Sequence, residues 1–225
     1  MLSTQPLSNV WKAISTGDFN GDAASDVLLQ NQSTGVAQIM FLNTNAADAI
    51  GTVNSVAVLT TPGVNWKAIS AGDFNADGKS DVLWQNSSTK QVQFRLMNGT
   101  TVVNSPLTQS AAGLTAVGTG DFNGDGFSDA LFKNASGQAV VWFMYGDIRT
   151  GTKTVAKPGA GFNLSGAGDV DSNGYSDLIW TDALNNATAT LLGGPSSLAS
   201  TTVIGSSGLT HPGAGYNLLA STGGG

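Results

Sequence analysis

The residues best suited to chemistry lie in a nine-residue segment, residues 73–81 (DFNADGKSD), with side-chain oxygen atoms at its first, third, fifth and ninth positions. The segment occurs four times, and the first aspartates of successive copies are 55, 48 and 48 residues apart. Oxygen atoms of carboxylates, carboxamides and backbone carbonyls are the ligands of Ca²⁺, which takes about six to eight of them. Four calcium-binding loops are therefore predicted. The other copies are residues 18–26 (DFNGDAASD), 121–129 (DFNGDGFSD) and 169–177 (DVDSNGYSD).

The sixth position of the segment should control its backbone. Glycine there, at Gly78, Gly126 and Gly174, would allow a sharp turn that brings the carbonyl of the seventh residue towards the four side chains. Ala23 takes this position in the first copy, which weakens the prediction for that loop. The predicted ligands are the side chains at positions 1, 3, 5 and 9 and the backbone of position 7: Asp18, Asn20, Asp22, Ala24 and Asp26; Asp73, Asn75, Asp77, Lys79 and Asp81; Asp121, Asn123, Asp125, Phe127 and Asp129; Asp169, Asp171, Asn173, Tyr175 and Asp177.

The same residues also allow a metal-free alternative, because Asp and Asn side chains often bond to their own backbone in turns. Against this alternative stands the electrostatic repulsion between three carboxylates that converge without a cation. The composition points the same way, since all 15 acidic residues are Asp and 12 of them lie in the four segments. We therefore favour calcium loops and keep simple turns as the alternative.

The residues that follow each segment argue against an EF-hand, which needs a bidentate Glu at position 12. Position 12 is occupied by Leu29, Trp84, Phe132 and Trp180 in the four copies. These residues belong to short apolar runs rich in strand-forming side chains, so each loop should be followed by a strand. The aspartate at position 9 must then close the metal site.

Each repeat contains the signals of four strands. An apolar segment precedes the loop, and after the loop come an apolar strand, a polar turn and an alternating strand such as residues 92–96. A hairpin turn such as Asn98-Gly99 and a last polar strand such as residues 101–107 complete the repeat. Four antiparallel strands repeated about every 50 residues are typical of the blades of a β-propeller. We therefore predict an all-β protein, a β-propeller of four-stranded antiparallel blades.

The whole chain, residues 1–225, is predicted to be one propeller domain. Its repeats span about residues 9–64, 65–112, 113–160 and 161–213, and a partial fifth repeat spans residues 214–225. Residues 2–7 could complete this fifth blade and close a ring, which would remove exposed strand edges. Alternatively, another chain could complete it in a ring or filament, or the sequence could be part of a longer propeller.

Several classes of function are excluded by composition. Nine basic residues and a pI near 4.4 argue against nucleic acid as a partner. No apolar run of about 18 residues is present, so no transmembrane segment is expected. Cysteine is absent, and the single histidine, His211, lies in a Thr-His-Pro-Gly turn without the partners of a catalytic triad. We expect a protein that is not an enzyme.

Three motifs resemble those of a known family. The loops with their preceding glycine, as in residues 72–81 and 120–129, together with DVLWQN (81–86) and RLMNG (95–99), resemble the FG-GAP or VCBS repeats of bacterial secreted proteins. Those repeats are related to the propeller repeats of integrin α subunits. The resemblance implies a secreted, extracellular, bacterial β-propeller with Ca²⁺ in its blade loops. Ala23, and the exchange of Asp and Asn at positions 171 and 173, depart from the family pattern.

We hypothesise a non-catalytic, calcium-binding propeller that acts as a carbohydrate-binding or adhesion module. Its partner would be a glycan or a cell-surface or matrix protein. The candidate ligand-binding residues are Trp142, expected to be the most exposed, and Trp84 and Trp180, for which packing in the core is the alternative. The rival hypothesis is a structural protein that assembles with itself into rings or filaments by completing the partial fifth blade between subunits.

Overall fold

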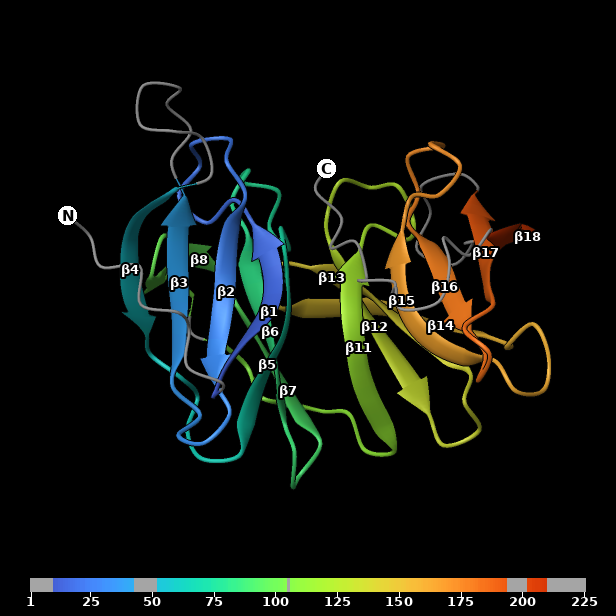
Figure 1. The fold of residues 1–225 in the computed structure, drawn as a ribbon, viewed down its shortest axis with the longest axis horizontal. Coiled ribbons are helices and arrows are strands. Elements are labelled where there is room, and N and C mark those ends of the chain that lie inside the picture. Colours follow the sequence, from blue (N-terminus) through green and yellow to red (C-terminus); the bar gives the residue numbers. More distant parts are fainter. Residues whose placement is uncertain (1–9, 43–51, 105, 194–201, 210–225) are drawn as a thin grey trace.

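The computed structural model describes residues 10–42, 52–104, 106–193 and 202–209, the last of these as backbone only. The described residues form four antiparallel four-stranded sheets and one two-stranded sheet (Figure 1). The predicted all-β class, with a four-stranded antiparallel sheet for each full repeat, is confirmed. The partial fifth repeat and His211 lie outside the described residues. Within the described part of the chain, no helix has the length and apolarity needed to cross a membrane.

The sheets follow the order of the repeats. Sheet 1 contains β1 (Trp11–Gly17), β2 (Asp26–Asn31), β3 (Ala37–Leu42) and β4 (Val53–Leu59). Sheet 2 contains β5 (Trp66–Gly72), β6 (Asp81–Asn86), β7 (Gln91–Arg95) and β10 (Gln109–Ser110). Sheet 3 contains β11 (Leu114–Gly120), β12 (Asp129–Asn134), β13 (Ala139–Tyr145) and β14 (Ile148–Val155). Sheet 4 contains β15 (Asn163–Gly168), β16 (Asp177–Thr181), β17 (Ala187–Gly193) and β18 (Thr202–Leu209). The two-stranded sheet contains β8 (Met97–Asn98) and β9 (Thr101–Val102).

Sheet 2 differs from the sequence prediction in its outer strand. The hairpin turn at Asn98-Gly99 is confirmed, but it pairs β8 with β9 in a separate ribbon, and the short β10 is the fourth strand of the sheet. The prediction of a last strand over residues 101–107 is therefore wrong. Asn104 explains the departure, because its side chain accepts a hydrogen bond from the Leu96 N–H and donates one to the Phe94 carbonyl. These bonds hold the chain after β9 against the end of β7.

The first strand of every sheet contains the same irregularity. In sheet 1, Ala13 pairs with Leu29 and Ser15 pairs with Leu28, so that one extra residue lies in β1, and equivalent shifts occur in β5, β11 and β15. A bulge of this kind increases the twist of a strand and re-aims the residues after it. In sheet 1 the hydroxyl of Ser15 accepts a hydrogen bond from the backbone N–H of Ala71 in β5. The bulge thus lies where the first strands of neighbouring sheets meet.

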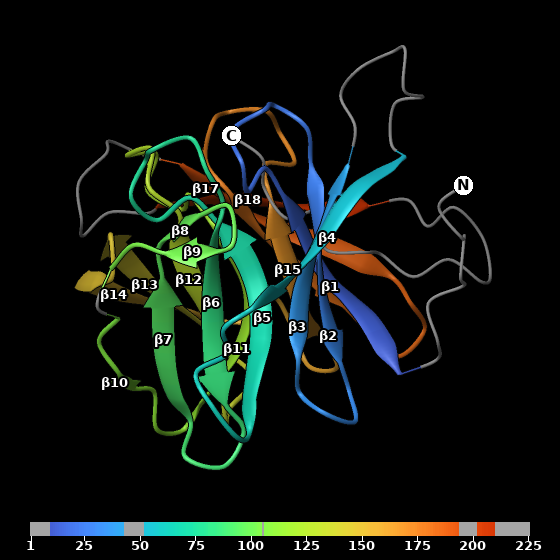
Figure 2. The same cartoon turned by 90° about the vertical axis from the view of Figure 1, so that its left-hand side faces the viewer.

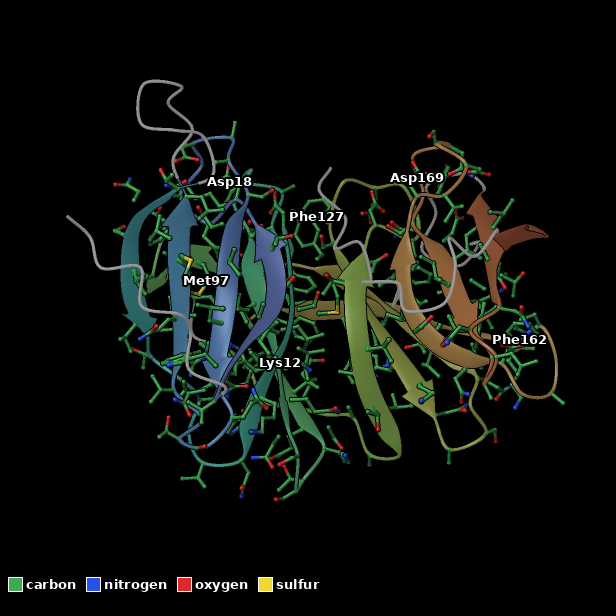
Figure 3. The ribbon with its side chains drawn as sticks, viewed as in Figure 1. Lys12, Asp18, Met97, Phe127, Phe162 and Asp169 are labelled. Carbon is green, nitrogen blue, oxygen red and sulfur yellow. The ribbon has the colours of Figure 1, made fainter. Side chains whose placement is uncertain are left out.

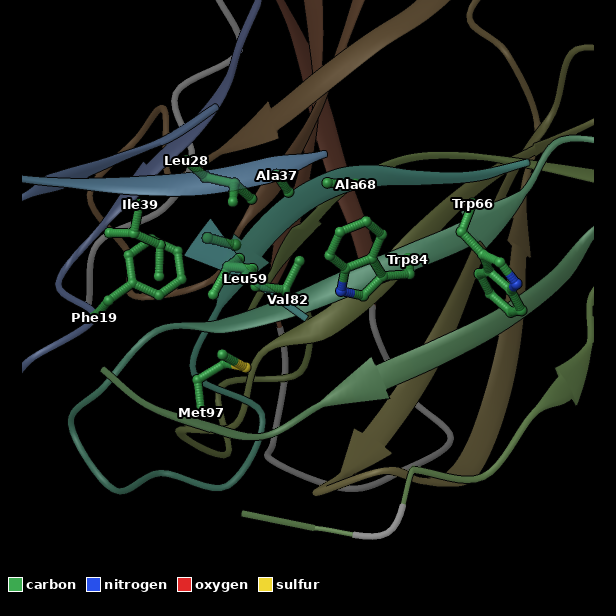
Figure 4. Close-up of a cluster of buried hydrophobic side chains, with 11 residues drawn as sticks. Phe19, Leu28, Ala37, Ile39, Leu59, Trp66, Ala68, Val82, Trp84 and Met97 are labelled. Carbon is green, nitrogen blue, oxygen red and sulfur yellow. The ribbon is translucent and has the colours of Figure 1, made fainter. Parts of the chain in front are cut away.

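Successive sheets pack face to face. Val82 and Trp84 of β6 pack with Phe19 against sheet 1, whereas Leu83, which lies between them in the strand, packs in the cluster shared with sheet 3. Three such clusters lie between sheets 1 and 2 (Figure 4), sheets 2 and 3, and sheets 3 and 4. The first strands contact one another in the order β1, β5, β11 and β15, and Figure 2 shows β5 between β1 and β11. The middle sheets are therefore apolar on both faces.

Two glutamines reinforce the first two of these junctions. The side-chain amide of Gln85 donates a hydrogen bond to the Leu114 carbonyl and accepts one from the Ala116 N–H. It thus forms with β11 the pair of bonds that the backbone of a neighbouring strand would form. Gln30 forms the same pair of hydrogen bonds with β5. In sheet 3 the equivalent residue is Lys133, whose ammonium group has no acceptor atom. The third junction therefore lacks this bridge.

Candidate metal centre

Each of the repeated loops joins the first and second strands of its sheet, as predicted. Figure 3 labels Asp18, Phe127 and Asp169 from three of the loops, and all three lie at the same end of the molecule. The loops begin immediately after a strand that ends in glycine and finish at the aspartate that begins the next strand. Two flanking strands of a rigid sheet therefore fix both ends of every loop.

The ninth aspartate of each loop is buried and hydrogen-bonded at both carboxylate oxygens. Asp81 accepts one bond at Oδ2 from the N–H of Phe74, the second loop residue, at 2.8 Å, and another at Oδ1 from the N–H of Met97, at 2.8 Å. The carboxylate thus ties the loop to the chain that follows the third strand. The same pair of bonds is made by Asp26 with Phe19 and Leu42, by Asp129 with Phe122 and Met144, and by Asp177 with Val170 and Leu192. Sequence reasoning assigned this residue only to the metal and missed its structural bonds.

Burial changes the acidity of these carboxyls. Desolvation raises the pKa of Asp81 and of Asp129 to about 8, opposed by the two backbone N–H donors and assisted by the neighbouring aspartates. The same causes raise the pKa of Asp26 and Asp177 to a smaller extent. A cation at the loop would favour the ionised form of each carboxyl. Without a cation, the ninth aspartates of the middle sheets therefore favour the protonated form more strongly than those of the end sheets.

The remaining polar side chains of the loop bond to the loop itself. In the second loop the Asp73 carboxylate accepts from the N–H groups of Asp77 and Gly78, at 3.1 and 2.8 Å. Asn75 accepts from the Asp77 N–H, and Asp77 accepts from the Lys79 N–H at 2.9 Å. These are the bonds expected of simple turns. Because each carboxylate or carboxamide oxygen has two lone pairs, the side chains at positions 1, 3, 5 and 9 each retain capacity for a cation.

Two residues of each loop have the left-handed backbone conformation. The sixth residue has a φ of 80° at Gly78, 85° at Gly126 and 86° at Gly174, and Ala23 adopts 66°. The first loop therefore keeps the shape of the others, with an alanine where glycine is favoured. The fourth residue is also left-handed in every loop, at Gly21, Ala76, Gly124 and Ser172, a requirement that sequence reasoning did not identify.

Among the described loops, the fourth has the arrangement of carboxylates that best fits a metal ion. One oxygen from each of Asp169, Asp171 and Asp177 lies within 4.8 Å of the other two, so this cluster could hold a metal ion. The Asn173 N–H bonds to both Asp169 and Asp171, and Asn173 in turn accepts from the Tyr175 N–H at 2.8 Å. The exchange of Asp and Asn at positions 171 and 173 therefore leaves the loop conformation unchanged.

Successive loops are joined by a repeated hydrogen bond that sequence reasoning missed. The N–H of Ser80, the eighth residue of the second loop, donates to the carbonyl of Asp18, the first residue of the first loop, at 2.6 Å. A Cβ atom at Gly17 would overlap the Ser80 side chain, so glycine is needed before the loop. The next two junctions repeat both features with Ser128, Asp73 and Gly72, and with Ser176, Asp121 and Gly120. We call this contact the serine junction.

The three candidate tryptophans lie in the cores between sheets. Trp84 and Trp180 are 1% and 0% exposed, in agreement with the core-packing alternative. Trp142 is 2% exposed, so the expectation that it is exposed is wrong. The Trp142 side chain lies on the face of β13 that packs against sheet 2, and its ring packs on Phe132. The Arg149 guanidinium lies over the same ring, 4.3 Å from its centroid. None of the three indoles is therefore placed to contact a ligand.

Fold and loops together define an all-β repeat protein with an Asp-rich loop in each repeat. The stretch from the second loop into β12, residues 73–132, matches the family model of the FG-GAP-like repeat. The resemblance to FG-GAP repeats is thereby confirmed for this segment. No curated protein matches the chain.

Proposed function

We propose that this protein is a non-catalytic, calcium-binding β-propeller module in which the four sheets are blades and Ca²⁺ in the loops stabilises their junctions. The observation that carries the proposal is the cluster of Asp169, Asp171 and Asp177 oxygens within 4.8 Å of one another, in a loop whose conformation all four repeats share. Oxygen-only ligands of this kind suit a hard cation such as Ca²⁺. The succession of first strands supports the arrangement of the sheets as blades.

In this proposal the ion would connect three parts of the fold. The ninth aspartate reaches the end of the third strand or the chain just after it through its backbone bonds, as Asp26 does at Leu42 and Asp81 does at Met97. The first aspartate reaches the next loop through its carbonyl, as Asp73 does at Ser128. A cation bound to both carboxylates would offset the repulsion between them. Calcium would therefore stabilise the sheets and the contact between them.

The proposed binding role of the protein is based on its repeat family. FG-GAP repeats are generally non-enzymatic, which supports a binding role over catalysis. We propose an extracellular location with a glycan or a cell-surface or matrix protein as partner. The three buried tryptophans give no support to a sugar site at Trp84, Trp142 or Trp180.

Calorimetric titration with Ca²⁺ tests the proposal, combined with thermal melting in EDTA, Mg²⁺ or Ca²⁺. A ligand that binds only the folded state at a hundred times its Kd stabilises by about 2.7 kcal/mol, so the melting temperature should rise clearly with Ca²⁺. Asp169→Asn should remove one binding event. Asp182→Asn is the matched control, because Asp182 also accepts backbone N–H bonds in a turn but lies outside the loops. If Ca²⁺ gives neither heat nor a shift in melting temperature, the loops are simple turns.

A further inference from the structure

Each junction between sheets is built from two complementary halves. At the first junction, sheet 1 contributes the Asp18 carbonyl and the buried Phe19 ring, which we call the leading half. Sheet 2 contributes the Ser80 N–H together with Val82 and Trp84 on one face of β6, which we call the following half. The second and third junctions repeat the serine junction and the face-to-face core. A free following half on one sheet and a free leading half on another therefore carry the groups of the same hydrogen bond.

Sheet 1 carries a following half that meets no other described sheet in this way. Ser25 occupies the eighth loop position and is exposed, and within the described residues its N–H makes no serine junction. Val27 is equivalent to Val82, and through its pairing with Met40 it shares a face with Val56 and Val58. Val56 and Val58 are 48% and 63% exposed. On this face Leu29, equivalent to Trp84, is buried and Gln38 is half-buried, whereas Val56 and Val58 leave its outer edge exposed.

Sheet 4 carries the leading half. Within the described residues the carbonyl of Asp169 accepts no serine junction. Val170 occupies the second loop position, and it is 38% exposed where the phenylalanines of the other three loops are fully buried. Ile179 of β16 is equivalent to Leu83 and Leu131, which pack against the following sheet, but it is only half-buried. The two unused halves thus lie on the first and last of the described sheets.

We propose that sheet 4 of one copy of this chain packs on sheet 1 of a second copy through a fourth junction of the same kind. The contact is heterologous, because the two faces that meet are different surfaces of the chain. Two copies joined by two such junctions would place eight sheets in one ring, within the range of about four to eight blades in propellers. The occupant is a second copy because this chain itself carries both halves.

Two exposed valines allow each half to be blocked separately. Val58→Asp places a charge on the following half, and Val170→Asp places one on the leading half. Val64→Asp is the matched control, since Val64 is 85% exposed in the turn before β5. The masses are measured by light scattering coupled to size exclusion over a range of concentrations, and melting temperatures check the fold of each variant. An equimolar mixture of the two blocked variants is measured in the same way.

The unchanged protein and the Val64→Asp control are expected at twice the chain mass of 22.8 kDa. Each blocked variant alone should have the mass of one chain. Their mixture should return to two chains, because one intact half of each kind remains. Restoration by mixing is specific to a heterologous contact, which a general loss of folding would not produce.

Three results would overturn the proposal. The first is a single-chain mass for the unchanged protein at every concentration. The second is a Val58→Asp variant with a lower melting temperature and the same mass, which would mean that the chain itself covers this face. The third is a Val170→Asp variant that keeps the double mass while Val58→Asp loses it, which would mean that like faces pair. A two-chain mass without any Ca²⁺ binding would leave this proposal standing and refute the proposed function.

Discussion

The ninth aspartates of the middle and end sheets make the same hydrogen bonds in different surroundings. Asp81 and Asp26 each accept one N–H from the loop and one from the end of the third strand or just after it, yet the pKa of Asp81 rises to about 8 and that of Asp26 rises less. The bond to Met97 is buried, whereas the bond to Leu42 is partly buried. The same sequence motif therefore has a different carboxyl pKa in the middle and end sheets, because the neighbouring sheets bury it to different extents.

Among the second strands, only that of sheet 2 is buried throughout. Every residue of β6 is buried, whereas β2, β12 and β16 each contain two half-buried residues. The junctions also differ, since Gln85 bridges sheets 2 and 3 while Lys133 stands at the equivalent place between sheets 3 and 4. The stability of a repeat is thus set by its neighbours as much as by its own residues. Four sets of substitutions or conditions test how the middle and end sheets differ.

The pH dependence of stability should give the largest difference between middle and end. In EDTA the folded-state pKa of Asp81 lies above its usual value of 3.8, so its protonation stabilises the folded protein below about pH 4, and this contribution is lost as the pH rises through about 8. Shifts of this size correspond to roughly several kcal/mol. Asp81→Asn should flatten the dependence of melting temperature on pH more than Asp26→Asn does. Saturating Ca²⁺ should weaken or reverse the dependence, because the ion binds the ionised carboxyls.

Removal of the carboxyl altogether should have the next largest effect. Asp81→Ala leaves the buried N–H groups of Phe74 and Met97 without an acceptor, which should cost about 3 kcal/mol of unfolding free energy. Asp26→Ala should cost about half as much, because water reaches the Leu42 N–H more easily. Urea unfolding in EDTA measures both values. Equal losses would mean that burial does not distinguish the two sites.

Exchange of the bridging residues tests the junctions. Gln85→Lys removes two hydrogen bonds to β11 and leaves the Ala116 N–H buried without a partner, which should cost about 2 kcal/mol. Lys133→Gln should gain about 0.5 kcal/mol or more by forming the missing bridge to β15. The pair is measured by urea unfolding at one pH. A loss from both substitutions would show that the third junction does not accept the bridge.

Exchange of the sixth loop residue should give the smallest effect. Ala23→Gly relieves a positive φ of 66° and should stabilise the first loop by about 1 kcal/mol, while Gly78→Ala should destabilise the second by a similar amount. Both changes are read from melting temperature in EDTA and from Ca²⁺ affinity. If Ala23→Gly leaves both unchanged, the first loop carries no strain from its alanine.

Those features that repeat within one segment could be predicted from the sequence. The loops, the strands that flank them and the Asn98-Gly99 turn follow from local residue patterns. Features that depend on a neighbouring repeat could not be predicted. Trp142 is buried because sheet 2 covers it, and the chain after β9 is diverted by the contacts of Asn104. The serine junction could not be predicted because its donor and its acceptor lie in two different repeats, about 60 residues apart in the sequence.

The serine junction also bears on how such a chain can change in length. Its donor, its acceptor and the glycine that makes room for it all belong to the repeated motif, at the eighth and first loop positions and just before the loop. A duplicated repeat therefore arrives with both halves of a new contact already encoded. Gene duplication or deletion of one repeat can therefore lengthen or shorten the array and keep this hydrogen bond between the repeats that become neighbours.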